Sequence, residues 1–250
     1  MKTETLRVSS NENIPSSYKW RRERLIVIFL LLIASAIIFA GFARTYYLNA
    51  FFARRSLTAI LHLHGFLFSA WFVLLFVQIS LIAKRRTDLH RRVGYIGALL
   101  ALSMVIVGIA VTIHAVRHGT LAKPPGLPMA NFLVVPFFDV VVFATLAGAG
   151  LYFRTKPQVH KRLMILATLG ILTAGLARIP LDFIRNRDIS TIFLMGDIVA
   201  LVYIAHDTLT HKRLHSASLF GGLLIVLSVP FRFTIDDTQV WQNFTAWLIR

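Results

Sequence analysis

The feature that most constrains this chain is a series of seven apolar runs, most of them as long as the roughly 18–20 residues that cross a bilayer as a helix. A backbone in lipid has to satisfy its own hydrogen bonds, so runs of this kind form helices. Hydrophobic residues make up 56% of the chain and charged residues only 15%, which is unlike a soluble domain. The sequence therefore predicts an all-α, integral membrane helical bundle.

Seven spans divide the chain into three parts. We place the spans at 25–43, 57–83, 93–116, 129–153, 162–181, 189–206 and 216–232. The last run is short and holds two glycines and a proline, so six spans and a re-entrant segment form the alternative. Residues 1–24 form a basic tail, 25–233 the transmembrane bundle, and 234–250 an amphipathic helix with Trp241, Phe244 and Leu248 at helical spacing.

The distribution of Lys and Arg predicts the orientation of the bundle. The amino-terminal tail and the segments 84–92, 154–162 and 207–215 hold 17 of the 27 cations, whereas the opposite side holds 10. The side with more cations is cytoplasmic by the positive-inside rule. We therefore expect a cytoplasmic amino terminus and, with seven spans, an external carboxyl terminus.

Two function classes are disfavoured by composition. The formal charge of +16 suggests nucleic acid in a soluble protein, but here the cations lie in short segments beside apolar spans, so topology accounts for them and no nucleic-acid partner is expected. The chain has no cysteine, which excludes disulfides, thiolate metal sites, thiol catalysis and covalent c-type haem attachment.

A histidine motif recurs on the predicted cytoplasmic side. "KRRTDLHRRVGY" (84–95), "RTKPQVHKRLMI" (154–165) and "AHDTLTHKRLHS" (205–216) align His90, His160 and His211, each followed by two cations. The chain thus reads as one leading helix and three similar helical hairpins. Three roles stay open for these turns: interfacial anchors, a site for anionic lipid headgroups, or neutral imidazoles that ligate a metal or haem iron.

Ionisable residues inside spans are the other candidates, because charge in lipid is costly. His62 and His64 point about 200° apart on a helix, and His64 shares a stripe with Trp71 and Gln78, so we expect His64 to face the bundle. Asp139 is predicted near mid-membrane. The candidates fall into two groups. We expect an outer polar cavity formed by His64, His114, Arg178, Asp182, Asp197 and Arg44 to Tyr47. We expect an inner cluster formed by Gln78, His90, His160, His206 and His211.

Several stretches resemble a group of uncharacterised bacterial polytopic membrane proteins: "GFARTYYLNAFF", "LHLHGFLFSAWFVLLFVQ", "LHRRVGYIGALL" and "HKRLMILATLGILTAGLARIP". This resemblance covers most of residues 41–181, implies a bacterial inner-membrane location and brings no settled activity with it. The pentapeptide "HKRLM" (160–164) is also similar to a helix start in a small membrane family linked to haem–copper oxidase assembly. That similarity implies at most a connection with haem.

Four functional hypotheses follow. In a haem-binding or redox module, His64 with His114 would ligate an outer b-type haem and His90 with His160 an inner one. A small-molecule transporter would use Asp139, Asp197 and Arg178. A structural, lipid-binding or assembly role needs only the bilayer and anionic lipid at the turns. A zinc hydrolase is disfavoured, because no span places two histidines four apart. The sequence does not decide whether the chain is an enzyme, and it predicts no separate metal-ion site.

Overall fold

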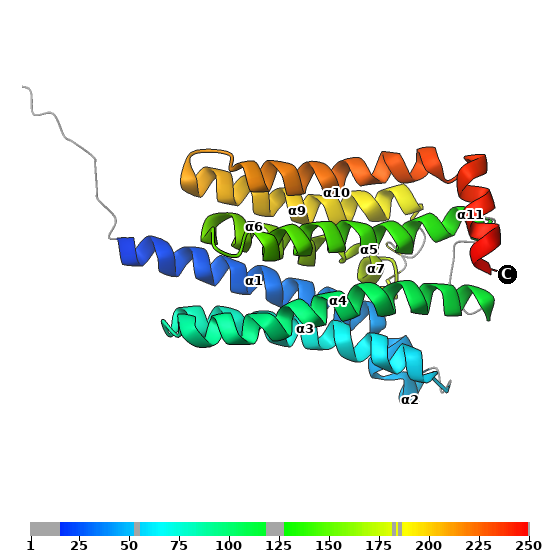
Figure 1. The fold of residues 1–250 in the computed structure, drawn as a ribbon, viewed down its shortest axis with the longest axis horizontal. Coiled ribbons are helices and arrows are strands. Elements are labelled where there is room, and N and C mark those ends of the chain that lie inside the picture. The colour runs from blue at the N-terminus through cyan, green and yellow to red at the C-terminus, as the bar shows by residue number, and fades with distance from the viewer. Residues whose placement is uncertain (1–15, 53–55, 119–127, 182–183, 185–186, 250) are drawn as a thin grey trace, which may run out of the picture.

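The computed structural model describes residues 16–52, 56–118, 128–181, 184 and 187–249, and within them it contains helices and no strand (Figure 1). The helices are, in chain order, α1 (Ser16–Phe42), the π-helical segment η1 (Ala43–Tyr47), α2 (Asn49–Phe52), α3 (Ala59–Ala83), α4 (Thr87–Arg117), α5 (Met129–Tyr152), α6 (Pro157–Gly170), α7 (Thr173–Leu176), α9 (Ile189–His211), α10 (Ser216–Ile235) and α11 (Gln239–Ile249).

Seven helical stretches in the described residues are long and apolar enough to cross a membrane, which confirms the predicted all-α, seven-span bundle. Six of them are single helices or a helix continued by η1, and the fifth combines α6 and α7 over Pro157–Leu176. The seventh, α10, runs unbroken for 20 residues. At 1.5 Å per residue this is about 30 Å, enough to cross the hydrocarbon layer of a bilayer.

Two spans begin earlier than the sequence predicted. The third starts at Thr87 rather than at residue 93, and the fifth starts at Pro157 rather than at residue 162. Asp88 in the first turn of α4 and Pro157 at the start of α6 both favour a helix start. His90 and His160 therefore lie on helices, each as the fourth helical residue, and not in loops.

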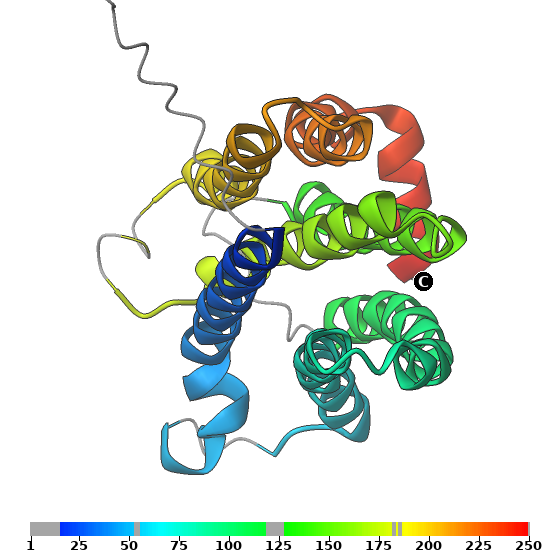
Figure 2. The same ribbon diagram turned by 90° about the vertical axis from the view of Figure 1, so that its left-hand side faces the viewer.

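The two ends of the bundle differ (Figure 1). The α3–α4, α5–α6 and α9–α10 turns lie together at one end, which we call the turn end, and α11 crosses the opposite end, which we call the α11 end. Both views place α5 and α6 between the α3–α4 pair and the α9–α10 pair (Figures 1 and 2). The turn end is the side on which the sequence predicted the excess of cations.

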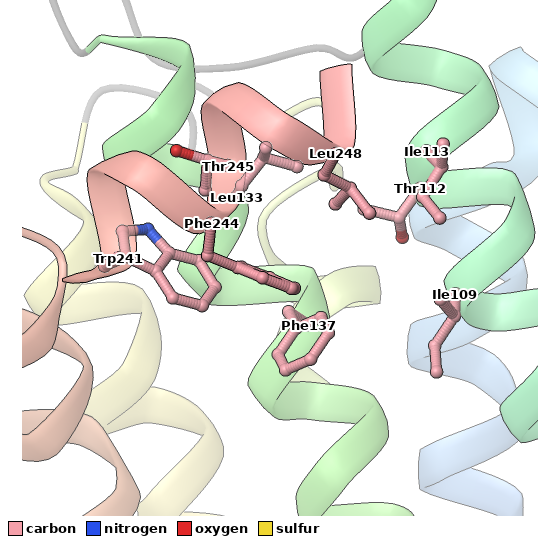
Figure 3. A pocket seen from close by; sticks show the side chains of 9 residues that line it. All are labelled: Ile109, Thr112, Ile113, Leu133, Phe137, Trp241, Phe244, Thr245 and Leu248. Carbon is pink, nitrogen blue, oxygen red and sulfur yellow. The ribbon is translucent and has the colours of Figure 1, made fainter. Parts of the chain in front are cut away.

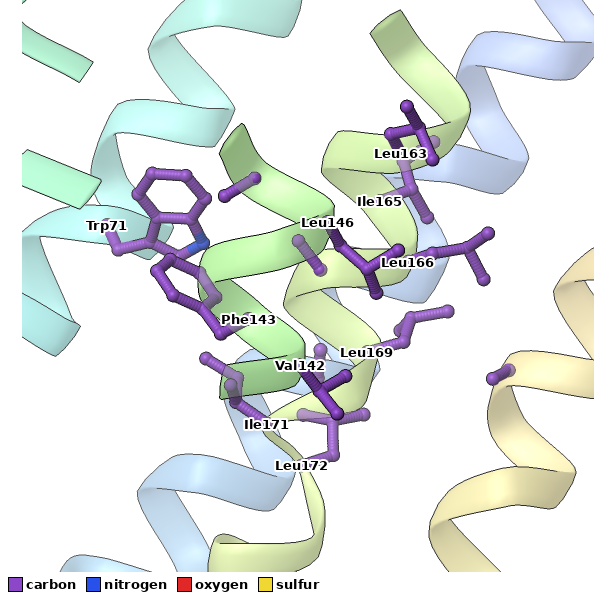
Figure 4. Packing of buried hydrophobic residues seen from close by; sticks show 14 of the residues in the cluster. Trp71, Val142, Phe143, Leu146, Leu163, Ile165, Leu166, Leu169, Ile171 and Leu172 are labelled. Atoms are coloured by element: carbon purple, nitrogen blue, oxygen red, sulfur yellow. The ribbon is translucent and has the colours of Figure 1, made fainter. Parts of the chain in front are cut away.

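Large apolar side chains hold α6 at the centre of the bundle. Leu163, Leu166 and Leu169 are all at most 2% exposed. The indole Nε1 of Trp71 in α3 donates to Thr168 Oγ1 in α6 at 3.2 Å, and the ring of Trp71 packs edge-on against Phe143 in α5 at 5.2 Å between centroids (Figure 4). A buried Trp supplies a large apolar surface and needs one hydrogen-bond acceptor, and Thr168 provides it.

Small residues allow the neighbours of α4 to pack closely against it. Gly97, Ala101, Gly108 and Ala115 are buried, and they recur at intervals of four or seven along α4. Small side chains on one stripe let helix backbones approach each other in a membrane. This stripe explains why α4 packs extensively against both α3 and α5.

Candidate functional site

A buried ion-pair network joins four helices at the turn end. Arg162 of α6 donates from Nε and Nη2 to the two carboxylate oxygens of Asp207 in α9, at 2.6 and 2.9 Å. Its Nη1 donates to the backbone and side-chain oxygens of Gln158 at 2.7 and 2.8 Å. Ser218 of α10 donates to Asp207 at 3.2 Å. Arg162 and Asp207 are only 1% and 5% exposed, so the charges are paired out of water.

The amino-terminal helix is tied into the same network. Glu23 of α1 accepts from Lys161 at 3.1 Å and lies 3.3 Å from Nε2 of His211. Nδ1 of His211 lies 2.8 Å from the carbonyl oxygen of Asp207. These residues, Glu23, Lys161, Arg162, Asp207 and His211, are called the turn-end network below. Because its members satisfy one another, the network serves to hold α1, α6, α9 and α10 together.

The cations of the histidine turns differ in their surroundings. Lys161 and Arg162 face internal carboxylates, whereas Arg91 and Arg92 of the first turn are exposed. The third turn also departs from the other two. His211 is the last residue of α9 and not the fourth residue of the next helix, so the sequence alignment of the three histidines does not extend to their structural positions.

His215 caps the helix that follows the third turn. Its Nδ1 accepts from the backbone N–H of Ala217 at 3.1 Å at the start of α10. Partial burial, together with the positive charge of Arg162, lowers the pKa of His215 below its ordinary value of 6.5. The neutral form that can accept this hydrogen bond is therefore the favoured one.

The first two turns bring His90 and His160 together. Their ring centroids lie 6.3 Å apart with the rings nearly perpendicular, at 81°. Nδ1 of His160 lies 2.7 Å from the carbonyl oxygen of Gly150 in α5. Gln78 of α3 contacts Nδ1 of His90 through its side-chain amide at 2.6 Å. Three of the predicted inner residues thus form one contact group, called the histidine pair with Gln78.

A second buried ion pair lies in the half of the bundle toward the α11 end. Nη1 of Arg232 in α10 donates to Asp139 of α5 at 2.7 Å, and the two side chains are 4% and 13% exposed. The guanidinium also lies over the ring of Phe193, 4.7 Å from its centroid. The sequence prediction included Asp139 but treated Arg232 only as one of the cations that set the orientation of the bundle.

Two further charges surround this pair. Asp197 of α9 lies within electrostatic range of Arg232, and Arg178 lies within range of Asp139. Arg178 donates to the carbonyl oxygen of Ala174 at 2.7 Å. Within the described residues neither Asp197 nor Arg178 contacts an opposite charge. Asp139, Arg178, Asp197 and Arg232 are called the charge cluster below.

The predicted outer histidines do not form a pair. His64 stacks on Phe68 at 4.3 Å and lies within electrostatic range of Arg178, whereas His114 stacks on His118 at 4.1 Å. The side chain of His62 is exposed, and Nδ1 of His64 is buried without a hydrogen-bond partner in the described part of the chain. His64 thus lies near Arg178 of the charge cluster, and His114 stays near the end of α4.

Arg44 and Tyr47 lie in η1, where the first span winds as a π-helix. The hydroxyl of Tyr47 is 2.8 Å from Ser69 Oγ, and the hydroxyl of Tyr46 donates to the carbonyl oxygen of His62 at 3.2 Å. Arg44 lies over the ring of Phe52 at 5.6 Å. These contacts join the end of α1 to the start of α3, and among the described residues none brings Arg44 to an acidic side chain.

A pocket beneath α11 is separate from all of these groups (Figure 3). Aromatic and aliphatic side chains such as Phe137, Trp241 and Phe244 line it. The hydroxyls of its two threonines, Thr112 and Thr245, donate to carbonyl oxygens of their own helices. The pocket is therefore apolar, and it is not the polar cavity that the sequence predicted.

Sequence reasoning missed Glu23, Arg162, Asp207 and Arg232. Two signals were present: Asp207 stands one helical turn before His211, and Arg232 follows Pro230 inside the seventh apolar run. Asp182 lies outside the described residues. Among the residues that the structure does describe, no group of three or more His, Asp or Glu side chains is arranged to hold a metal ion.

Comparison of the chain with protein families, with curated proteins and with solved structures finds no match.

Proposed function

We propose that this polytopic membrane protein binds a small charged solute at the charge cluster and passes it across the membrane. The observation that carries the proposal is the Arg232–Asp139 pair, buried among apolar helices and accompanied by two more charges without contacting counter-ions. Ionisable groups inside a bundle are costly and typically mark the path of a substrate or ion. The cluster holds two acidic and two basic side chains, so it can attract both positively and negatively charged groups of a solute.

Prolines within two helices and a break in a third span lie near the cluster and support the proposal. Pro136 lies three residues before Asp139 in α5, and Pro230 lies two residues before Arg232 in α10. The fifth span breaks between α6 and α7, and Arg178 follows its last turn. A proline inside a helix leaves one backbone carbonyl without its usual partner, and in transporters broken helices line the binding site. Two prolines inside continuous helices and one helix break lie beside the same group of charges, which fits a site better than a static structural role.

Unsatisfied polar atoms also support a binding role. Nε of Arg232 and Nδ1 of His64 are buried without a hydrogen-bond partner in the described residues. Buried groups of this kind are rare in native proteins and call for a specific explanation, such as a bound water or ion. The side chains of the cluster pack against their neighbours, so a solute enters by moving α9, α10 or the segment after α7.

The partners and location belong to the same proposal. We place the protein in the inner membrane of a bacterium. Its turn end is placed in the cytoplasm, because most cations lie at that end. Arg91, Arg92, Lys212 and Arg213 are exposed there. Exposed cations at a membrane surface attract anionic lipid headgroups, so these four residues are the proposed lipid contacts.

The test is ligand-induced thermal stabilisation of the detergent-purified protein by a panel of small carboxylates, amines and zwitterions. A solute at tenfold its dissociation constant stabilises the folded state by about 1.4 kcal/mol. We expect one class to raise the Tm of the wild type and to lose that effect in Asp197→Asn, a change that breaks no hydrogen bond or ion pair among the described residues. Asp88→Asn, at the exposed Arg86–Asp88 pair, is the matched control.

Uptake of the stabilising class into proteoliposomes then tests transport. Asp139→Asn is expected to abolish uptake, and Asp88→Asn to leave it unchanged. Equal stabilisation of wild type and Asp197→Asn, or no stabilisation by any class, would contradict a solute site at the charge cluster. Stabilisation without uptake would keep the binding site and overturn the transport step.

A further inference from the structure

The four side chains of the charge cluster follow one another with alternating sign. At its centre, Asp139 accepts from Arg232 at 2.7 Å, and these two side chains are 4% and 13% exposed for Arg232 and Asp139 respectively. Arg178 lies within electrostatic range of Asp139, and Asp197 lies within range of Arg232. Both outer members are only partly buried, and neither contacts an opposite charge within the described residues. The unpaired charges of the cluster are therefore one positive and one negative.

The packing of α9 on α7 brings the two outer members to one part of the bundle. A Cβ added at Gly196 would lie 2.7 Å from Oγ1 of Thr173 and 3.9 Å from Cδ1 of Leu176. Asp197 follows Gly196 directly, and Arg178 lies two residues after Leu176. Each outer member interacts with a different member of the central pair. A solute that reaches both outer members therefore has to span that pair.

Arg178 is placed to take an anionic group. Its guanidinium lies over the ring of Phe42, 5.0 Å from the centroid, and its Nη1 donates to the carbonyl oxygen of Ala174. A guanidinium that stacks on a ring keeps its N–H groups in its own plane, where they match the geometry of a carboxylate. His64 lies within electrostatic range of Arg178, and its Nδ1 is buried without a partner in the described residues. When Nδ1 carries the ring proton, it can donate to the same anionic group.

Asp197 is placed to take a cationic group. The opposite charge within its range is that of Arg232, which is already paired with Asp139. Phe193 stands one helical turn before Asp197 on α9, and its ring lies 4.7 Å from the guanidinium of Arg232. This face of α9 is therefore turned toward the cluster. An ammonium group has three N–H donors and no acceptor, so the oxygens of Asp197 suit it.

The balance of charge selects the class of solute. The cluster holds two acidic and two basic side chains, so its formal charges cancel. A solute with a net charge would add an uncompensated charge to the interior of the bundle, which is costly in a medium of low dielectric constant. A zwitterion adds no net charge, and it supplies each outer member with an opposite charge. The cluster therefore suits a solute that carries both signs.

We propose that the solute is a zwitterion with one carboxylate, held by Arg178 and His64, and one ammonium group, held by Asp197. The buried pair of Asp139 and Arg232 lies between the two ends and keeps them apart. This inference rests on the solute site proposed above and narrows its ligand to one chemical class. Amino acids, including those with the amino group remote from the carboxylate, are the simplest members of that class.

The experiment measures thermal stabilisation of the full-length protein in detergent by three zwitterions: L-alanine, β-alanine and 4-aminobutanoate. One, two and three carbon atoms respectively separate their carboxylate and ammonium groups. Each is compared with its amide, which keeps only the positive charge, and with its N-acetyl derivative, which keeps only the negative charge. We expect at least one zwitterion to raise the Tm with increasing concentration. Its two derivatives should bind about 10- to 100-fold more weakly, because each leaves one charged side chain unpaired.

Two charge variants should exchange the preference for these compounds. Asp197→Asn removes the negative end of the site, so the N-acetyl derivative should bind at least as well as the zwitterion. Arg178→Gln removes the positive end, so the amide should gain in the same way. A merely structural role of these side chains would produce no such exchange. Asp197→Asn breaks no hydrogen bond or ion pair among the described residues, so it remains informative if Arg178→Gln fails to fold. Asp88→Asn should keep the preference of the wild type.

The outcomes separate this inference from the proposed function. Equal binding of a zwitterion and one of its derivatives by the wild type would overturn the inference, because the solute would then need only one charge. Stabilisation by simple carboxylates or amines, but by no zwitterion, would overturn it and leave the solute site standing. Stabilisation by no compound of either set would contradict both proposals.

Discussion

Arg162 and Asp207 meet at two points, 2.6 and 2.9 Å, although they lie 45 residues apart in the sequence. Both side chains are almost inaccessible to solvent. A bidentate contact between guanidinium and carboxylate is stronger and more specific in its geometry than a single hydrogen bond. The pair joins α6 to α9, and Ser218 extends it to α10, so the packing of three helices depends on it.

Breaking this pair from one side should be strongly destabilising. Asp207→Asn keeps the shape of the side chain but leaves the guanidinium of Arg162 buried without its counter-charge, which costs about 3–5 kcal/mol. Thermal unfolding in detergent measures the loss. Arg91→Met, at an exposed position, should change the Tm little. The double variant Arg162→Met with Asp207→Leu should be less damaging than Asp207→Asn, and an unaffected Tm in Asp207→Asn would contradict the role of the pair.

Protonation of His215 should lower the stability of the folded state in acid. Folding lowers the pKa of its imidazole, chiefly by burial, so the folded state favours the neutral form. The contribution of this residue is complete above the unfolded pKa of about 6.5 and is lost as the pH falls through the lower folded pKa. His215→Ser keeps a helix cap that does not titrate. Its Tm should depend less on pH below about 6.5 than that of the wild type; parallel pH profiles would refute this.

The fold could be predicted from the sequence because lipid allows few alternatives. Seven apolar runs required seven helices, and their number and order are as expected. The starts of α4 and α6 were placed six and five residues too late, because the charged first turns were assigned to loops. A helix start at a membrane surface does not need apolar residues, so hydropathy alone could not locate it.

The candidate site could be predicted only in part. Single residues such as Asp139 stand out because charge is costly in lipid, but their partners depend on which helix faces lie together. Arg232 lies 93 residues from Asp139, and no local pattern links the two. Arg162 belongs to a motif that resembles two exposed turns, and only the packing of α9 against α6 shows that it is buried.

The turn between α9 and α10 carries a strained residue. Lys212 follows the last residue of α9 as its C-cap, with φ of 54° and ψ of 24°, in the left-handed region. That conformation costs an L-residue roughly 1–2 kcal/mol and costs glycine little. Lys212→Gly should therefore raise the free energy of unfolding by about 1 kcal/mol, as measured by denaturant titration. Arg213→Gly, one residue on and without a positive φ, should give no gain; an equal gain would show that charge removal is responsible.

Close packing of α1 on α7 requires a glycine at residue 41. A Cβ added there would meet the backbone of Gly175 well inside van der Waals distance, and backbone atoms cannot rotate away. Gly41→Ala should therefore lower the Tm. Gly148→Ala in α5 is the matched control, because a Cβ at that position meets nothing within 4 Å. If the two variants melted alike, the α1–α7 contact would not be essential.

The orientation of the bundle can be tested by thiol labelling of introduced cysteines, because the chain has no cysteine of its own. Lys212→Cys places a thiol at the turn end and Gln239→Cys places one at the start of α11, and both positions are exposed. The excess of cations at the turn end predicts that this end faces the cytoplasm. A membrane-impermeant maleimide added to intact cells should therefore label Gln239→Cys alone, and it should label Lys212→Cys only after permeabilisation. The cysteine-free parent shows non-specific labelling. The opposite pattern would reverse the topology and place the histidine pair with Gln78 on the outside.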